Sequence, residues 1–283
     1  MRLRLLFQIA LCILFLSLAS VPALAWDSKD FSGDDSARLM SVMDNLAYIA
    51  DGDDNGRHLY VLFSPDCSAS KAFYDVALKN PGKVQIRWIP VDPSGDLNSM
   101  FEEAGTDILK DAFVKSEIPG DVDPGRTAAI ARYNNAALFW LCLCEMIAPD
   151  SNLAFPTFVY GSKDKASVFI GMNSDINFDK FIAPVPDTGA TALPDALRFA
   201  GESIDLSPTP QIKEYAPGSE SKTVRAFPAP DAVKLGSVKA NTTLPVPVVG
   251  VTKNGYLAID MLGTKTYLFI EDEAAAQAAL AKK

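Results

Sequence analysis

The pattern of hydrophobic and polar positions divides the chain into segments of different character. Apolar residues recur at three- and four-residue intervals between Ala37 and Ala50, which predicts an amphipathic helix. Two short apolar runs rich in strand formers, residues 59–63 and 84–91, flank a helical segment at residues 68–78. A strand–helix–strand unit is therefore predicted, as in α/β folds.

The following segments extend this pattern. Residues 97–149 carry no comparable strand pattern, and the long apolar stretch 127–147 is typical of a buried helix. Residues 156–160 and 167–172 are predicted as two strands joined by a polar turn, and residues 174–182 as a last helix.

Beyond residue 183 the chain changes character. Residues 184–222 are rich in Pro, Gly, Ser and Thr, which predicts a linker. Residues 223–272 contain short strands and turns, with a strong hairpin signal at Asn254-Gly255, and are predicted as a small all-β domain. The Ala-rich end, residues 273–283, is predicted as a short helix or a frayed tail.

The N-terminus has the pattern of a signal peptide. Arg2 and Arg4 precede the apolar run Leu5–Leu18, and small residues precede a cleavage position after Ala25. We therefore expect residues 1–25 to be removed on export. A membrane anchor is the alternative, but the run is shorter than the ~20 apolar residues that span a bilayer.

Composition and charge narrow the classes of partner. Hydrophobic residues make up 48% of the chain and charged residues 22%, which indicates a folded core. The 26 Lys and Arg residues against 35 Asp and Glu residues give a net charge of −9, and loss of Arg2 and Arg4 leaves 24 against 35, or −11. Phosphates would be repelled by this charge, so no nucleic-acid partner is expected.

Three of the four cysteines remain after cleavage, because Cys12 lies in the signal peptide. This odd number leaves at least one thiol outside an internal disulfide. Cys142 and Cys144 are two positions apart on the predicted helix and point in opposite directions, so they are not expected to bridge each other or to share a metal. They are interpreted as core residues, with pairing of one of them to Cys67 left open.

Cys67 is the residue best placed for chemistry. It follows a predicted strand and begins a predicted helix, where unpaired backbone N–H groups favour a thiolate. Lys71 adds a nearby cation, whereas Asp66 acts in the opposite direction. The thiolate is the nucleophilic form of cysteine, so Cys67 is a candidate nucleophile, with an inert buried thiol as the alternative.

Other sites are less well supported by the residues available. The loop that begins at Asp51 resembles a calcium loop, but Leu62 occupies the position that requires a bidentate Glu. His58 is the only histidine and begins a predicted strand, which indicates a residue at the edge of a strand. The sequence 68–71 matches S-x-x-K without the partner motifs of penicillin-binding enzymes. Neither a metal nor a cofactor is predicted.

Residues 63–74 (FSPDCSASKAFY), 87–91 (RWIPV) and 155–159 (FPTFV) together resemble the thioredoxin-fold periplasmic disulfide isomerases of the DsbC/DsbG type. The resemblance covers residues 36–183 and implies a thioredoxin-like domain with a helical insertion at residues 97–149. It implies that Cys67 is the attacking cysteine and that Pro156 is a cis proline facing it. The implied substrate-binding residues are Ser68, Ser70, Phe155 and Thr157.

The chain departs from this family at the second cysteine of the motif. Ser70 stands where the family has a resolving cysteine, so no disulfide can close within the motif. The resemblance therefore implies isomerase-like or monothiol exchange in the periplasm, with exported client proteins or a redox partner. The segment before residue 36 is too short for the dimerisation domain of the family.

Residues 223–272 are similar to the small SH3-like barrels of exported bacterial proteins. Such modules bind cell-wall peptides or envelope proteins, and Phe227, Tyr256 and Tyr267 are candidate groove residues or core residues. Together the two resemblances leave a second functional class open. In that class the protein is a non-enzymatic binding component of the envelope or of a secretion complex.

Overall fold

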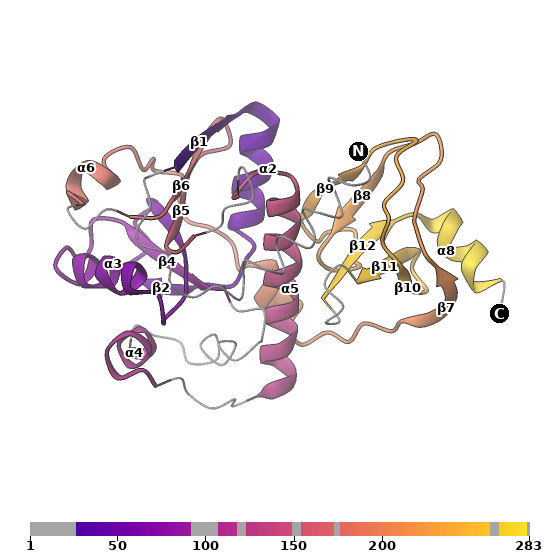
Figure 1. The fold of residues 1–283 in the computed structure, drawn as a ribbon, viewed down its shortest axis with the longest axis horizontal. Helices are drawn as coiled ribbons and strands as arrows, with labels where there is room; N and C mark the ends of the chain where they lie inside the picture. The colour runs from indigo at the N-terminus through magenta and orange to yellow at the C-terminus, as the bar shows by residue number, and fades with distance from the viewer. Residues whose placement is uncertain are drawn as a thin grey trace.

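The computed structural model describes residues 27–91, 107–117, 123–148, 154–172, 176–260 and 266–281. It is a mixed α/β structure with two β-sheets, and α5 (Pro124–Leu143) stands between them (Figure 1). The predicted signal peptide and parts of the predicted 97–149 insertion lie outside the described residues.

The first sheet has the strand order β1-β6-β5-β3-β4-β2. β3 runs parallel to β4 and antiparallel to β5, so the predicted strand–helix–strand unit is confirmed. The predicted hairpin is also present, because β5 and β6 are antiparallel neighbours. The strands are β1 (Asp27–Ser32), β2 (Ile49–Asp51), β3 (His58–Phe63), β4 (Gln85–Pro90), β5 (Thr157–Gly161) and β6 (Lys165–Ile170).

Helices cover both faces of this sheet (Figure 1). Alternate side chains of β3 point to opposite faces, with Tyr60 and Leu62 in one core cluster and Val61 and Phe63 in another. The first cluster contains side chains of α2 and α5, and the second contains side chains of α3 and α6. We call the first sheet and its helices the first half of the molecule, and the second sheet with α8 (Glu273–Leu280) the second half. The helices of the first half are α2 (Gly33–Met43), α3 (Ser68–Leu78), α4 (Asp107–Lys110), the π-helical turn η2 (Asp111–Lys115), α5 and α6 (Phe178–Ile182).

Several helix boundaries differ from the sequence-based expectation, and two of the differences have a clear local cause. α2 ends before the polar pair Asp44-Asn45, and Ile49 therefore belongs to β2 rather than to the predicted helix. α5 begins earlier than predicted because the carboxylate of Asp123 accepts the N–H of Arg126 at 3.0 Å and Pro124 occupies the first helical position.

The second sheet has the order β7-β10-β11-β12-β8-β9, with α8 packed against it. Among the described strands, β7 and β9 are the two edges and do not pair, so the predicted SH3-like barrel is not closed. Phe227 and Tyr256 are buried, which favours the core alternative for these two aromatics. The elements are β7 (Ser207–Ile212), β8 (Lys222–Arg225), β9 (Lys234–Val238), β10 (Val248–Val251), β11 (Tyr256–Asp260), β12 (Tyr267–Glu271) and α8 (Glu273–Leu280).

The proline-rich stretch 184–222 has more structure than a bare linker. It contains α7 (Asp195–Arg198) and β7, which pairs with β10 and extends the second sheet beyond its predicted start. The prolines in β7 are compatible with this pairing because β7 is an edge strand, where a missing N–H need not leave a gap in the ladder. The hydroxyl of Tyr215 also donates to Asp272 at 2.7 Å in a buried hydrogen bond.

The two halves share one continuous hydrophobic core. Buried side chains of α2, α5 and the second sheet belong to the same cluster, and α5 contacts β9 and β12. The rings of Phe199 and Phe227 stack with centroids 4.2 Å apart and an interplanar angle of 7°. The connecting segment is therefore packed against both halves.

Gly236 in β9 is expected to be required for this packing. A Cβ atom at residue 236 would lie 2.5 Å from Nε1 of Trp140, whose buried ring has little room to move. We expect Gly236→Ala to lower the free energy of unfolding by about 2 kcal/mol, as overpacking does. Urea titration would measure the loss. Gly201→Ala is the matched control, because nothing lies within 4 Å of its new Cβ; equal stability of the two variants would refute this role of Gly236.

Candidate functional site

Cys67 lies at the junction between β3 and α3, where its backbone is held from both sides. Its N–H donates to the carbonyl of Ser64 at 3.1 Å, and its carbonyl accepts the N–H of Lys71 at 3.0 Å. Cys67 is the N-cap residue of α3 and is half-buried. The first N–H groups of a helix have no carbonyl partner within it, so the sulfur lies beside a region of partial positive charge.

The segment before β5 brings a second element to the same place. The Phe155–Pro156 peptide bond is cis, and the Cys67 Sγ donates to the carbonyl oxygen of Phe155 at 3.2 Å. These residues meet across 88 positions because β5 is antiparallel to β3, with Leu62 opposite Thr157. The end of one strand and the start of the other therefore lie together. The cis bond agrees with what the sequence resemblance implied for Pro156.

The four predicted substrate-binding residues differ in accessibility. Ser68 is exposed and Phe155 is half-buried, whereas the side chains of Ser70 and Thr157 are fully buried. Thr157 Oγ1 donates to the carbonyl of Ala154 at 2.6 Å and so holds the turn before β5. Direct contact with a client would fall to Ser68 and Phe155, and the binding role of all four stays a prediction.

The other two cysteines lie at the end of α5, and both pack against the shared core while remaining half-buried. Burial raises the pKa of the Cys144 thiol, which favours its uncharged form. Cys67, Cys142 and Cys144 are all thiols in the structure, so the open alternative of a bridge to Cys67 is not realised. The interpretation of Cys142 and Cys144 as core residues holds in part, because both pack against the core but neither is buried in it.

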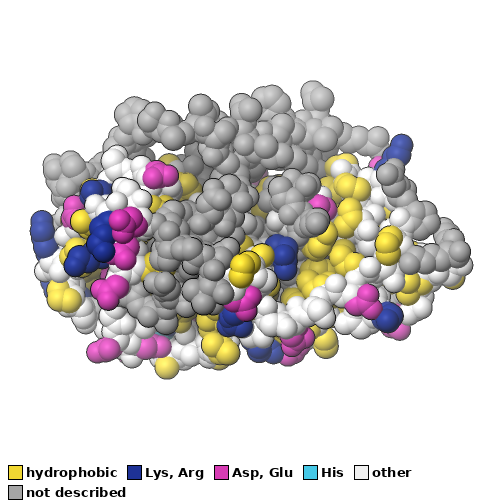
Figure 2. Space-filling view, turned by 90° about the horizontal axis from the view of Figure 1, so that it is seen from below, with side chains coloured by type: hydrophobic (Ala, Val, Ile, Leu, Met, Phe, Trp, Pro, Cys, Tyr) yellow, Lys and Arg dark blue, Asp and Glu magenta, His cyan; other side chains and the backbone are white. Residues whose placement is uncertain are grey.

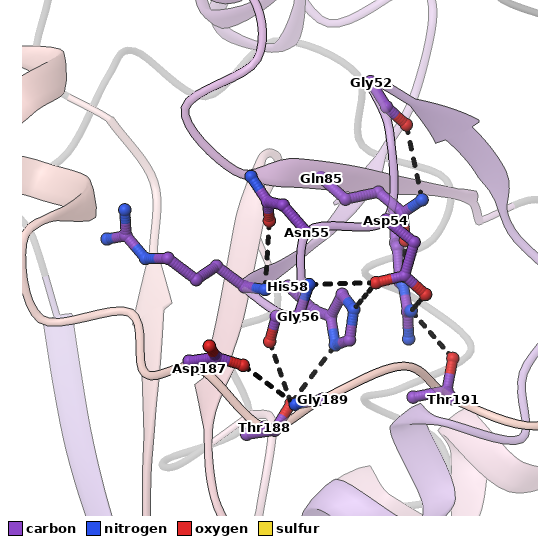
Figure 3. A network of polar contacts seen from close by, with 12 residues as sticks. Gly52, Asp54, Asn55, Gly56, His58, Gln85, Asp187, Thr188, Gly189 and Thr191 are labelled. Carbon is purple, nitrogen blue, oxygen red and sulfur yellow. Dashed lines mark hydrogen bonds and ion pairs between the residues drawn. The ribbon is translucent and has the colours of Figure 1, made fainter.

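A second polar constellation lies at the opposite end of β3, around His58 (Figure 3). His58 is the first residue of β3, as the sequence indicated, and it is buried, with only 4% of its surface exposed. Its Nε2 lies 2.8 Å from Oδ1 of Asp54, and its Nδ1 lies 3.3 Å from Oγ1 of Thr188.

The order Thr188–His58–Asp54 invites comparison with hydrolytic triads. The nearby N–H groups are engaged within the loop, since Thr188 donates to the carbonyl of Gly56 at 2.7 Å and Gly189 donates to Oδ1 of Asp187 at 3.0 Å. They are therefore not directed at a developing oxyanion, which such chemistry requires. The constellation is better explained as an anchor for residues 184–194.

Arg87 extends this anchor into the protein interior. Its guanidinium is fully buried and donates to the hydroxyl of Tyr60 at 2.7 Å and to Oγ1 of Thr191 at 2.8 Å. Asp44 Oδ1 lies 3.5 Å from Nη1 of Arg87, and Asp54 Oδ2 lies 3.6 Å from Nη2, so both carboxylates supply counter-charge. Burial raises the pKa of Tyr60 well above its usual value, so this hydroxyl stays protonated in the network.

The anchor predicts a pH dependence of stability. The hydrogen bond from His58 holds the pKa of Asp54 below its usual value. A lowered folded-state pKa gives stability that is present above the unfolded-state value of about 3.9 and is lost as pH falls through the folded-state value. Asp54→Asn is therefore expected to be less stable than wild type at pH 7, with a difference that shrinks below about pH 4.

Urea unfolding at a series of pH values would measure this difference. Asp53→Asn removes the same charge from an exposed neighbour and is the matched control. A deficit of Asp54→Asn that stays constant down to the acid limit would argue against the proposed role of the Asp54 carboxylate.

The described residues carry no signature of two other kinds of site. No three His, Cys, Asp or Glu side chains among them are grouped as metal ligands would be. None of the helices in the same residues has the length and apolar character needed to cross a bilayer. In comparisons with known proteins, no protein-family model matches the chain, and no curated protein matches it significantly.

Proposed function

We propose that this protein carries out thiol–disulfide exchange on exported client proteins, with Cys67 as the nucleophile. The observation that carries this proposal is the position of the Cys67 sulfur. It lies at the N-terminus of α3 and 3.2 Å from the Phe155 carbonyl, beside the cis bond to Pro156. A half-buried cysteine at a helix N-terminus lies beside backbone N–H groups of partial positive charge, which is the environment in which nucleophilic cysteines are found.

The proposal includes a thioredoxin-like arrangement for the first half of the molecule. The order β6-β5-β3-β4, with parallel β3 and β4 joined through α3 and with α6 following the β5–β6 hairpin, supports it. The long helical region between β4 and β5 supports the proposed helical insertion. An SH3-like second half has weaker support, namely a set of short antiparallel strands.

Apart from Cys67 itself, the exchange uses only the thiols and disulfides of the client. The Cys67 thiolate attacks one sulfur of a client disulfide, the new S–S bond joins protein and client, and the other client sulfur leaves as a thiolate. A client thiolate then attacks the mixed disulfide and releases Cys67 as a thiolate. The numbers of thiols and disulfides are unchanged over the cycle, so the reaction is an isomerisation and needs no external oxidant.

Acid quenching followed by capture would test the proposal with natural clients. The purified mature protein is mixed with an extract of exported proteins, acidified to protonate thiolates, and resolved with and without reductant. We expect reducible adducts with wild type and with Cys142→Ala, and none with Cys67→Ala. In a parallel pull-down without acid, clients that bind Cys67→Ala without a covalent bond would instead favour the binding-component alternative. No adducts with wild type after acid quenching would reject exchange.

A further inference from the structure

Ser70 has an unusual environment for a serine. Its side chain is fully buried, and within the described structure its hydroxyl has no hydrogen-bond partner. Buried hydroxyl groups are almost always hydrogen-bonded, and an exception calls for a specific explanation, such as a role in redox or catalytic chemistry. The burial of Ser70 also excludes the simplest alternative, which is a serine that is hydrogen-bonded to bulk water.

The helix places this hydroxyl close to the active thiol. Cys67 is the N-cap residue of α3 and Ser70 is its third helical residue, so the two side chains lie on one face of the helix. The third position is also the one from which a polar side chain reaches back to the N-cap residue in a capping box. Ser70 is thus a side-chain donor on the same helix face as Cys67 for which the described structure shows no other partner.

In the observed state the Cys67 sulfur bonds elsewhere. The thiol donates its proton to the carbonyl of Phe155 at 3.2 Å. Once this proton is lost to water, the sulfur can only accept hydrogen bonds, and a carbonyl oxygen offers it none. The anion then requires a donor, and the first turn of α3 carries the Ser70 hydroxyl on the same helix face.

We propose that the Ser70 hydroxyl is this donor, so that Ser70 is a positioning residue that holds the Cys67 sulfur as a thiolate ready for attack. This inference rests on the proposed exchange function and extends it to the residue that replaces a second thiol. The hydroxyl donates its hydrogen bond to the anion without transferring its proton. When the sulfur forms the mixed disulfide, its negative charge disappears and the hydroxyl is released.

The proposal predicts that Ser70→Ala lowers the reactivity of the Cys67 thiol without lowering the stability of the protein. Ser70→Ala keeps the packing volume nearly unchanged and removes a buried hydroxyl that satisfies no partner in the resting state. We therefore expect its melting temperature to equal or exceed that of wild type. A serine with a purely structural role would give a lower melting temperature and an unchanged thiolate fraction.

Alkylation of Cys67 by iodoacetamide, followed by peptide mapping as a function of pH, is the deciding experiment. We expect the midpoint pH of the reaction to rise by about one unit in Ser70→Ala, which is about tenfold less thiolate at pH values below the midpoint. Ser68→Ala, which removes an exposed hydroxyl one position after Cys67, should leave the midpoint unchanged. Ser70→Thr, which keeps a hydroxyl, should have a midpoint pH close to that of wild type.

The outcomes separate this inference from the proposed function. An unchanged midpoint in Ser70→Ala overturns the role of Ser70, even if client adducts form normally. A raised midpoint together with absent client adducts supports Ser70 as the thiolate donor and rejects exchange on clients. An equal shift in Ser68→Ala would show a general effect of helix-start hydroxyls and would also overturn the specific role of Ser70.

Discussion

Ser70→Cys is expected to shorten the lifetime of a mixed disulfide at Cys67 by about a hundredfold or more. In wild type only a second molecule can release the bound group, because the motif holds one thiol. The new thiol would lie on the same helix face and attack the mixed disulfide internally, at the millimolar effective concentrations of short tethers. Attack forms a disulfide within the motif and expels the bound group as a thiolate.

A coloured leaving group makes this measurement direct. The protein is first converted to its mixed disulfide with 5-thio-2-nitrobenzoate, and release of the coloured thiolate is followed without added thiol. Ala69→Cys is the matched control, since a thiol two positions from Cys67 points away from it on a helix. Slow release from Ser70→Cys, at the rate of wild type, would show that the first turn of α3 does not bring the two positions together.

Asp195→Ala is expected to lower the free energy of unfolding by about 3 kcal/mol, because it leaves hydrogen-bond donors in the protein interior without a partner. Asp195 is 5% exposed and accepts the backbone N–H of Val233 at 2.6 Å and the hydroxyl of Tyr133 at 3.3 Å. It also pairs with Arg198 at 2.5 Å. One carboxylate therefore joins α5, α7 and the segment before β9, and its loss leaves buried donors unsatisfied.

Asp231→Ala provides a matched comparison for this effect. Asp231 pairs with the same Arg198 but is exposed, so its removal should change stability little. Urea unfolding followed by tryptophan fluorescence would report on the buried Trp88 in β4 and Trp140 in α5 together. Equal losses in the two variants would mean that Asp195 acts only as a surface charge and does not hold the halves together.

Local patterns predicted the first half of the fold well. The helix at Ser68–Leu78 and the strands around it were identified because short apolar runs and a helical period are set by neighbouring residues. The stretch 184–222 was misjudged because prolines usually interrupt strands. β7 accommodates them at a sheet edge, which only its pairing with β10 reveals.

The candidate site was predicted in part. The motif at Cys67 and its resemblance to a known family indicated Cys67 and Pro156, and the structure places their segments together. The isolation of the Ser70 hydroxyl and the environment of Asp195 depend on packing between distant segments, so no local pattern indicated them. Arg87 did leave a signal, because a cation within an apolar strand requires buried partners.

Reaction with oxidised glutathione under native conditions tests most directly whether Cys67 exchanges with disulfides. Peptide mapping of the folded protein locates the adduct, and the same reaction in denaturant gives the reactivity of each cysteine without the fold. The account predicts that Cys67 is glutathionylated much faster than Cys142 and Cys144 in the native protein, and that this difference disappears in denaturant. A native protein in which Cys67 stays unmodified, and reacts only once it is unfolded, would contradict the account.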